Sequence, residues 1–314
     1  MPTMINPPHL SEFQIDADVA LPVLAHGGGC RCVLHARRRL GGALIGGGAL
    51  AALGLAGPAA AQDAECKRSQ FTKVVSAEQI EQAAGQQYRR MLQEASAKRA
   101  LGPADDGQLQ RLRYIAQRII AFTAGCNERA QQWRWEVNLI GSKDLNAFCM
   151  PGGKIVFYHG ILAKLQLDDN EVAMIMGHEV AHALLEHARE RTGKTVATRG
   201  LIELGSALFG LGGLGNVVAD LGGQLLTLRF SRDDESEADA LGLLLAAKAG
   251  YQPSAGVTLW QKMMEASKGA PPQWLSTHPS GDSRIRDIES RLPRVEPLYR
   301  AATKPDRRFS PPSA

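Results

Sequence analysis

Net charge is low in this chain. Its 314 residues carry 36 Lys and Arg against 32 Asp and Glu, a formal excess of +4 at pH 7. An excess this small for the length argues against nucleic acid, or a strongly anionic surface, as a partner. The hydrophobic fraction of 44% permits a substantial core, in one large domain or two small ones.

Long apolar segments are scarce, and the chain lacks the repeated spans of a multi-spanning membrane protein. One uncharged run, 40–61, follows three arginines at 37–39 and ends in Pro58-Ala59-Ala60-Ala61. This order predicts a secretory signal cleaved before Gln62, and hence a periplasmic protein. The alternative is an uncleaved membrane anchor, since the run is just long enough to cross a bilayer. Its glycines and its small final residues favour cleavage.

Cysteine is also scarce: the chain has five, of which three remain once residues 1–61 are removed. In an oxidising compartment Cys66 and Cys126 could pair and leave Cys149 free. The sequence alone does not decide this pairing.

Histidine is rare as well, but two of the eight stand four residues apart in Gly177-His178-Glu179-Val180-Ala181-His182. On an α-helix this spacing places both imidazoles on one face, where they can share a metal. Glu179 then lies about 60° around the helix from His182, within reach of a water on that metal. This His-Glu-x-x-His arrangement is typical of zinc metallopeptidases, with two ligands and a general base on one turn. The surrounding run, 168–191, is predicted as a buried helix, in which a cation would satisfy these polar groups.

His187 belongs to the same predicted helix. At nine residues from His178 it would lie about 180° around the helix axis. We therefore expect a structural histidine at the helix end, not a third ligand.

An acidic run at 231–239 leads into another predicted helix. Glu235 and Asp239 are four apart and share a face, whereas Glu237 points away and is expected to be solvated. A catalytic zinc with two histidines commonly takes a carboxylate third, so Glu235 is the predicted ligand and Asp239 an outer acceptor for a ligand histidine N–H. The alternative is an acidic cluster favoured only by the helix dipole.

Three short extended pieces are predicted between the helices. Alternation at 134–139 is typical of a half-buried strand, and 146–150 is expected to pair with 154–158 across a Pro-Gly-Gly turn. A free strand edge beside the metal helix could bind an extended peptide through its backbone. The candidate substrate-binding residues are Asn146, Ala147 and Phe148. The alternative is a strand with no role beyond the sheet.

Two scaffold helices are predicted before these strands, at about 76–100 and 106–123. The apolar, glycine-rich segment 201–228 is predicted to be a mobile lid, or a loop that contacts substrate or a membrane surface.

Taken together, these motifs resemble the CAAX prenyl protease-like family of zinc metallopeptidases, which includes the HtpX and BepA types. The resemblance covers roughly 76–292 and keeps the family order. The matching segments are Asn146-Ala147-Phe148, Pro151-Gly152-Gly153, the His-Glu-x-x-His motif, Ser231-Arg232 with Glu235 and Asp239, Gly250-Tyr251-Gln252-Pro253, and Ser276-Thr277-His278-Pro279. It implies an α+β fold, a mostly helical zincin-like (gluzincin) domain with a small β-sheet beside the metal helix.

The resemblance also implies roles for residues that spacing alone does not single out. It implies one zinc ion per chain with Glu235 as third ligand. It further implies that His278 occupies the open position of the zinc in a latent state, and that Arg284 stabilises the oxyanion or the substrate. Without multi-spanning segments or room for the helical repeats of BepA, we expect a small periplasmic branch of the family.

The expected function is that of a zinc metalloendopeptidase acting on misfolded or misassembled cell-envelope proteins, with no nucleic-acid partner. The expected organisation is a leader at 1–61, a peptidase domain at 62–296 and a disordered tail at 297–314. One alternative is a periplasmic chaperone or assembly factor whose zinc only organises the fold or stays latent. The other is a membrane-anchored peptidase.

Overall fold

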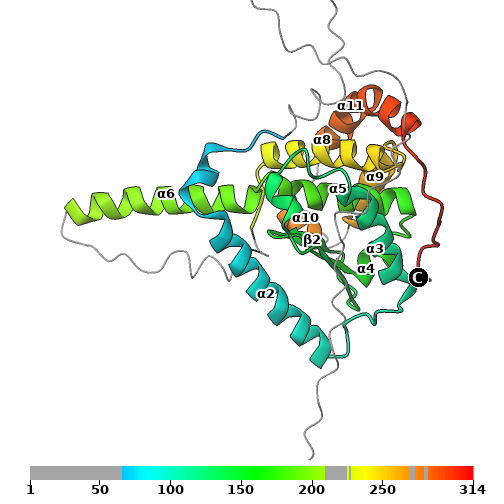
Figure 1. Ribbon diagram of the computed structural model, residues 1–314, viewed down its shortest axis with the longest axis horizontal. Coiled ribbons are helices and arrows are strands. Elements are labelled where there is room, and N and C mark those ends of the chain that lie inside the picture. The colour runs from blue at the N-terminus through cyan, green and yellow to red at the C-terminus, as the bar shows by residue number, and fades with distance from the viewer. Residues whose placement is uncertain (1–65, 209–224, 226–227, 269–272, 279–281, 314) are drawn as a thin grey trace, which may run out of the picture.

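The computed structural model describes residues 66–208, 225, 228–268, 273–278 and 282–313. The fold is α+β and mostly helical, as the sequence predicts (Figure 1). The elements are η1 (Gln70–Val74), α2 (Ala77–Ala97), α3 (Gly107–Ile120), η2 (Glu128–Gln131), β1 (Glu136–Ile140), β2 (Ala147–Met150), β3 (Lys154–Tyr158), α4 (His159–Lys164), α5 (Asp169–Leu184), α6 (His187–Leu208), α8 (Arg232–Lys248), α9 (Ala255–Ala266), α10 (Gln273–Thr277) and α11 (Asp282–Ala301).

The three strands form one small sheet in the order β1-β3-β2. β2 and β3 pair antiparallel across the Pro-Gly-Gly turn, which confirms the predicted hairpin, and β1 lies parallel to β3. Gly153 has a φ of +74°, and a Cβ there would lie 2.8 Å from the Trp135 ring, so only glycine closes this turn against the core. β2 is left at the edge of the sheet and lies beside α5.

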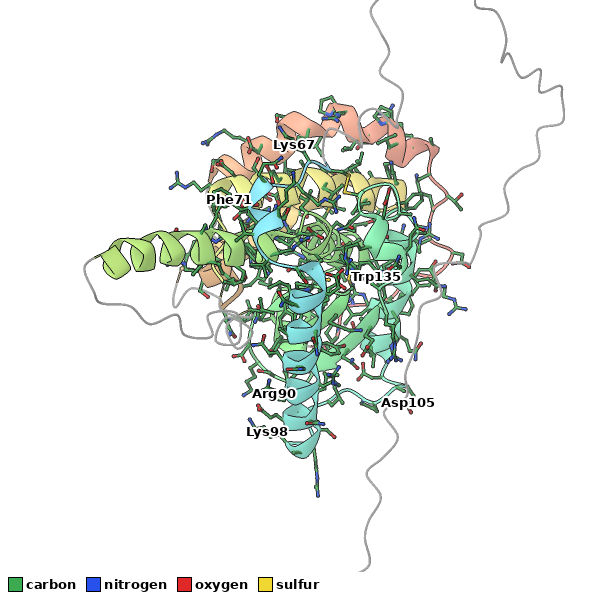
Figure 2. All side chains as sticks on the ribbon, turned by 60° about the vertical axis from the view of Figure 1, so that its left-hand side comes forward. Lys67, Phe71, Arg90, Lys98, Asp105 and Trp135 are labelled. Atoms are coloured by element: carbon green, nitrogen blue, oxygen red, sulfur yellow. A yellow bond between two sulfur atoms is a disulfide. The ribbon has the colours of Figure 1, made fainter. Side chains whose placement is uncertain are left out.

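Helices cover both faces of the sheet. Side chains on one face join the main core with α3, α5 and α8, in which Trp135 is fully buried (Figure 2). The other face packs against α2, whose Tyr88 hydroxyl accepts a hydrogen bond from Asn138 at 2.7 Å. The metal helix α5 therefore lies inside the protein, next to the sheet edge.

Both ends of helix α5 are set by local features, a capping box at its start and a residue with positive φ just after its end. Asp168 caps it reciprocally with Glu171. The helix stops at Leu184, and Glu186 then adopts a positive φ of +58°. A new helix, α6, begins at His187 and extends beyond the rest of the protein (Figure 1). The predicted single helix to residue 191 is therefore wrong, and so is the placement of His187 derived from it.

Helices α5 and α8 approach each other closely at two glycines. A Cβ on Gly177 would lie 2.6 Å from the carbonyl oxygen of Gly242, and one on Gly242 would lie 2.6 Å from the backbone nitrogen of His178. No real Cβ makes such contacts, so two glycines are needed for this separation. The carboxylates on α8 are thereby brought to the histidines on α5.

The N-terminal part of the described chain is fastened to the core by a disulfide between Cys66 and Cys126. Of the two pairing outcomes that the sequence left open, the structure shows the bonded one, and Cys149 remains a buried thiol. Segment η1 then packs on α6, where Gly193 leaves room for the carbonyl of Phe71 (Figure 2).

The C-terminal segment differs from the expected disordered tail. Helix α11 continues past 297 to Ala301, and the chain then packs against α3. The Phe309 ring contacts Tyr114 at a centroid distance of 5.8 Å, and the Phe309 amide donates to the Asp169 carboxylate. Apolar contact and a hydrogen bond to a buried acid hold a segment whose composition alone predicts no structure.

Among the described residues, no helix has both the length and the apolar character needed to cross a bilayer. The predicted leader at 1–61 lies outside the described residues. So does most of the predicted lid, of which the structure describes the end of α6, Leu225 and Leu228.

The glycine contact between α5 and α8 yields a prediction about stability. Gly242→Ala forces the helices apart, and overpacking of this kind costs about 1–3 kcal/mol of the free energy of unfolding. Gly107→Ala is the matched control, since a Cβ there meets nothing within 4 Å. Urea unfolding of both variants measures the difference. Equal stabilities would show that the helices separate without cost.

Candidate metal centre

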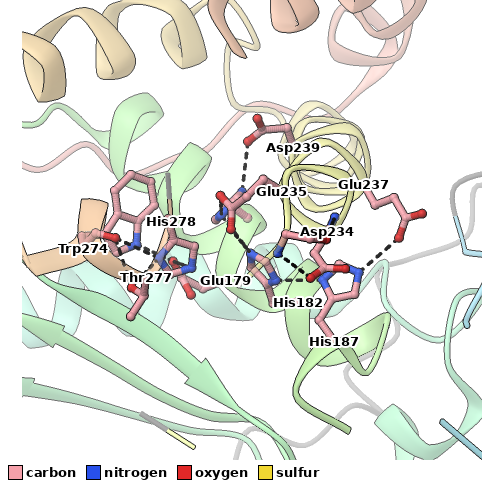
Figure 3. A network of polar contacts seen from close by, with 12 residues as sticks. Glu179, His182, His187, Asp234, Glu235, Glu237, Asp239, Trp274, Thr277 and His278 are labelled. Atoms are coloured by element: carbon pink, nitrogen blue, oxygen red, sulfur yellow. Dashed lines mark hydrogen bonds and ion pairs between the residues drawn. The ribbon is translucent and has the colours of Figure 1, made fainter. Parts of the chain in front are cut away.

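Four buried side chains from three parts of the fold converge on one point. His178 and His182 come from α5, Glu235 from α8, and His278 from the residue that follows α10 (Figure 3). One potential ligand atom from each lies within 4.8 Å of all the others. The two Nε2 atoms of His178 and His182 are 3.1 Å apart. The Glu235 carboxylate oxygens lie 3.6 Å from Nε2 of His178 and 3.5 Å from Nε2 of His182.

Two atoms of this cluster lack a hydrogen-bond partner among the described residues. They are Oε1 of Glu235 and Nε2 of His278, and both are buried. A buried acceptor without a partner costs free energy, and a cation at the centre of the cluster would satisfy both atoms at once. Imidazole nitrogens with a carboxylate are the donor set that zinc takes in catalytic sites. The residues present therefore fit a bound metal ion.

The protonation states of the metal-free site also suit a cation. Burial lowers the pKa of His178 to about 4 and lowers those of His182 and His278 well below the ordinary value. At neutral pH the three imidazoles are therefore uncharged, which is the form that binds metal. Burial raises the pKa of Glu235 to about 9, despite the nearby Arg284 guanidinium. A divalent cation would reverse this effect and favour the carboxylate.

Glu179 lies beside this cluster and not in it, as its place on the helix predicts. Its Oε1 accepts a hydrogen bond from the Trp274 indole N–H at 2.7 Å and lies 3.6 Å from Nε2 of His278. Burial raises the Glu179 pKa to about 8, while hydrogen bonds from Trp274 and the Cys149 backbone, together with the positive charge of Arg284, oppose the rise. The side chain is thus oriented by fixed donors in a site without bulk water, an arrangement suited to proton transfer.

Asp239 and Arg284 support the ligands from behind. Asp239 Oδ1 lies 3.0 Å from Nδ1 of His178, as the helix geometry predicts. Arg284 donates from Nε and Nη2 to the two Asp239 oxygens, at 2.7 and 2.5 Å, and from Nη1 to Glu235. Burial alone would raise the Asp239 pKa, but Arg284 and His178 bring it below its ordinary value. Asp239 therefore remains ionised and can accept the His178 N–H.

The Arg284 guanidinium lies between two carboxylates and an aromatic ring. It lies 3.9 Å over the Trp260 ring, and Nε, Nη1 and Nη2 all donate to Asp239 and Glu235. Through these nitrogens Arg284 holds both carboxylates in position, and its predicted role at the oxyanion or the substrate stays a prediction. The geometry favours a positioning role for Arg284.

His278 is the ligand candidate that only the resemblance singled out. Its ring stacks on Trp274 at a centroid distance of 4.9 Å. Its Nδ1 lies 2.9 Å from the Thr277 hydroxyl and 3.1 Å from the Trp274 carbonyl. With Nδ1 held in this way, Nε2 points toward the two histidines of α5 (Figure 3).

Sequence reasoning missed three aromatic contributors to the site. Trp274 holds Glu179, Trp260 lies under Arg284, and Phe230 stacks on the His182 ring at 4.0 Å. Phe230 also joins the His278 segment, because its amide donates to the Thr277 carbonyl at 3.2 Å. No local spacing marks any of them, since each reaches the site from an element remote in sequence.

The candidate substrate-binding residues lie at the edge of the sheet. Ala147 is buried, and Phe148 is half-buried against Tyr158 at a centroid distance of 6.3 Å. The Asn146 carbonyl accepts from the Tyr158 amide. The strand lies beside Glu179 through the Cys149 backbone. Peptide binding by this edge stays a prediction.

The fold and the ligand set are those of a zincin-like metallopeptidase. The family described as Peptidase family M48 matches residues 107–292, more than half of the chain. The chain belongs to this family, which confirms the resemblance of its motifs to the HtpX and BepA types.

Relatives come from mitochondria and from bacteria. The chain is 36% identical over 185 residues to the mitochondrial metalloendopeptidase OMA1 of Schizosaccharomyces pombe, covering 58% of this chain and 52% of the relative. It is 29% identical over 206 residues to the metalloprotease LoiP of Escherichia coli, covering 64% of this chain and 77% of LoiP. It is 28% identical over 207 residues to the beta-barrel assembly-enhancing protease of Yersinia pestis, covering 62% of this chain and 41% of that protease. The chain spans about half the length, or less, of the OMA1 relatives.

The buried position of Arg284 yields a prediction. Arg284→Met removes the positive charge between Asp239 and Glu235, and an uncompensated buried charge costs about 3–5 kcal/mol of the free energy of unfolding. Arg300→Met is the control, because its side chain is 78% exposed, and a surface ion pair contributes about 0–1 kcal/mol. Denaturant unfolding of the metal-free proteins compares them. A similarly small loss of unfolding free energy in both variants would contradict the supporting role of Arg284.

Proposed function

We propose that this protein is a zinc-dependent endopeptidase that holds one zinc ion through His178, His182 and Glu235. The observation that carries the proposal is the position of Glu179, buried beside the ligand cluster and oriented by Trp274 without belonging to the cluster. A purely structural metal site has no need of such a group. Zinc bound here would polarise a peptide carbonyl and lower the pKa of a water molecule.

Side chains of the protein carry out the proton transfers and orient the groups of the site. Glu179 takes a proton from the attacking water and returns one to the leaving amine. The Trp274 indole N–H holds one carboxylate oxygen of Glu179 throughout, so the side chain needs little rearrangement during the reaction. Asp239 and Arg284 hold His178 and Glu235 in position from the opposite side.

We further propose that an extended peptide binds along the edge of β2, at Asn146, Ala147 and Phe148. Support comes from the edge position of this strand beside α5. Backbone pairing is tolerant of side-chain identity, which suits the cleavage of unfolded chains.

The proposed substrates are misfolded or misassembled cell-envelope proteins, and the proposed location is the periplasm. Three observations support this: the leader-like 1–61 segment, the Cys66–Cys126 disulfide, and similarity to a protease whose name describes enhancement of β-barrel assembly. Segment 201–228 is proposed to contact substrate or the membrane surface on the basis of its composition.

A second candidate function rests on the position of His278. With His278 included, the cluster offers four protein ligands, and four is the number typical of structural zinc. An assembly factor with a structural zinc would have this site, and so would a latent peptidase in which His278 fills the open position. The presence of Glu179 favours the latent peptidase.

The general-base assignment predicts a separation of binding from activity. Glu179→Gln should retain zinc and the fold but lose casein proteolysis by at least about a hundredfold, as expected on removal of a general base. His178→Ala is the companion variant and should lose both zinc and activity. Metal analysis and proteolysis, with and without chelator, measure both properties. Near-wild-type turnover of Glu179→Gln would contradict the proposal.

The latency assignment predicts the effect of removing the fourth ligand. In His278→Ala a water can occupy the position that His278 would fill, so we expect zinc content to be unchanged and casein proteolysis to rise several-fold. Loss of zinc in this variant would favour a structural site. A fall in activity at full zinc content would instead show that His278 assists the reaction.

A further inference from the structure

The two histidines of the His-Glu-x-x-His motif differ in the partner of their Nδ1 atom. His178 contacts the carboxylate of Asp239 directly, at 3.0 Å. His182 contacts another histidine: its Nδ1 lies 2.8 Å from Nδ1 of His187. The break between α5 and α6 produces this contact, because it moves His187 from the far side of the helix to the Nδ1 side of His182.

The chemistry of the two rings fixes the direction of this hydrogen bond. Nε2 of His182 points to the ligand cluster, so Nδ1 carries the proton when Nε2 binds a metal. Nδ1 of His187 must then accept, which leaves the His187 proton on Nε2. That atom lies 3.2 Å from Oε2 of Glu237, an acceptor at a side chain that is 54% exposed. The order His182, His187, Glu237 is thus a continuous donor–acceptor chain from the ligand cluster to the surface (Figure 3).

We propose that His187, supported by Glu237, is a positioning residue that orients His182 for metal binding, in the place that Asp239 takes for His178. The proposal rests on the metal site proposed above. A ligand histidine normally gives its second N–H to a carboxylate, carbonyl or water, and such partners set ring orientation and ligand basicity. Here the His187 imidazole accepts the hydrogen bond from the His182 N–H, and the Glu237 carboxylate lies one partner further out.

A second cation beside His187 is the competing explanation, since Glu190 and Asp234 also lie within reach of it. Both acids are already engaged: Glu190 pairs with Lys194 at 2.5 Å, and Asp234 accepts the Ser231 amide at 2.7 Å. None of the three residues of this group has a buried side-chain atom without a partner among the described residues. These contacts favour the hydrogen-bonded chain over a second ion.

Two substitutions at His187 separate hydrogen bonding from packing. His187→Leu fills a similar volume but cannot accept the His182 N–H. His187→Asn is smaller and leaves space, but its Oδ1 stands two bonds from Cβ, as Nδ1 does in histidine. If His187 only packs, the Leu variant should retain more zinc affinity than the Asn variant. If His187 accepts the His182 N–H, the Asn variant should retain more. Glu190→Gln is the matched control, one turn away on α6 and comparably buried.

The test measures zinc affinity by competition with a chromophoric chelator, and the unfolding midpoint of each metal-free protein. We expect His187→Leu to bind zinc about 10- to 100-fold more weakly, the usual effect of losing an outer partner. We expect His187→Asn and Glu190→Gln to stay near wild type. The cobalt-substituted His187→Leu protein should also show a shifted visible spectrum, because the His182 ring is no longer fixed.

Three outcomes would overturn the proposal. Wild-type affinity in His187→Leu, or a Leu variant that binds zinc better than the Asn variant, would assign His187 to packing. Two zinc ions in the wild-type protein, with one lost in Glu190→Gln, would show a second metal site. A wild-type protein that binds no metal would contradict the proposed function itself. That result differs from the first one, in which wild-type protein binds zinc and only the His187 proposal fails.

Discussion

The structure depends on the burial of carboxylates against histidines where α5 meets α8. Removing ionisable groups from water is unfavourable unless opposite charges or hydrogen bonds replace the water. Here Glu235 and Asp239 enter the core because Gly177 and Gly242 let the helices touch. Arg284 supplies one positive charge to the pair, and the orphaned Glu235 oxygen leaves a place for a second one at the centre of the ligand cluster.

The side chains of the site are held by partners from other helices. Arg284 arrives from α11, Trp274 from α10, and His187 from α6. The polar atoms of these partners contact groups of the site and restrict the rotamers of those groups. The reactive geometry is therefore a property of the packed domain, and substitutions well outside the His-Glu-x-x-His segment can change it.

Two rings from adjoining segments, His278 and Phe230, lie against the histidines of α5. His278 points into the ligand set and Phe230 stacks on His182, while one backbone hydrogen bond joins their segments. With His278 as a fourth ligand, as proposed above, the site would belong either to a latent peptidase or to a protein with a structural zinc.

Features whose geometry is local could be predicted from the amino-acid sequence. A four-residue spacing places His178 with His182 on any helix, and a Pro-Gly-Gly turn pairs two strands, because these depend on backbone periodicity and nearby hydrogen bonds. Glu235 and Asp239 followed from the same periodicity and from the motif order of the family.

Tertiary structure alone decided where α5 ends, since Glu186 takes a positive φ without being glycine. That break moved His187 behind His182, and long-range packing turned Arg284 toward two carboxylates and carried Trp274 to Glu179. The Arg284 and Trp274 contacts join residues tens of positions apart, and the His187 contact depends on a helix break that no periodicity records. All of them exist because buried polar groups must find partners wherever the packed core brings them.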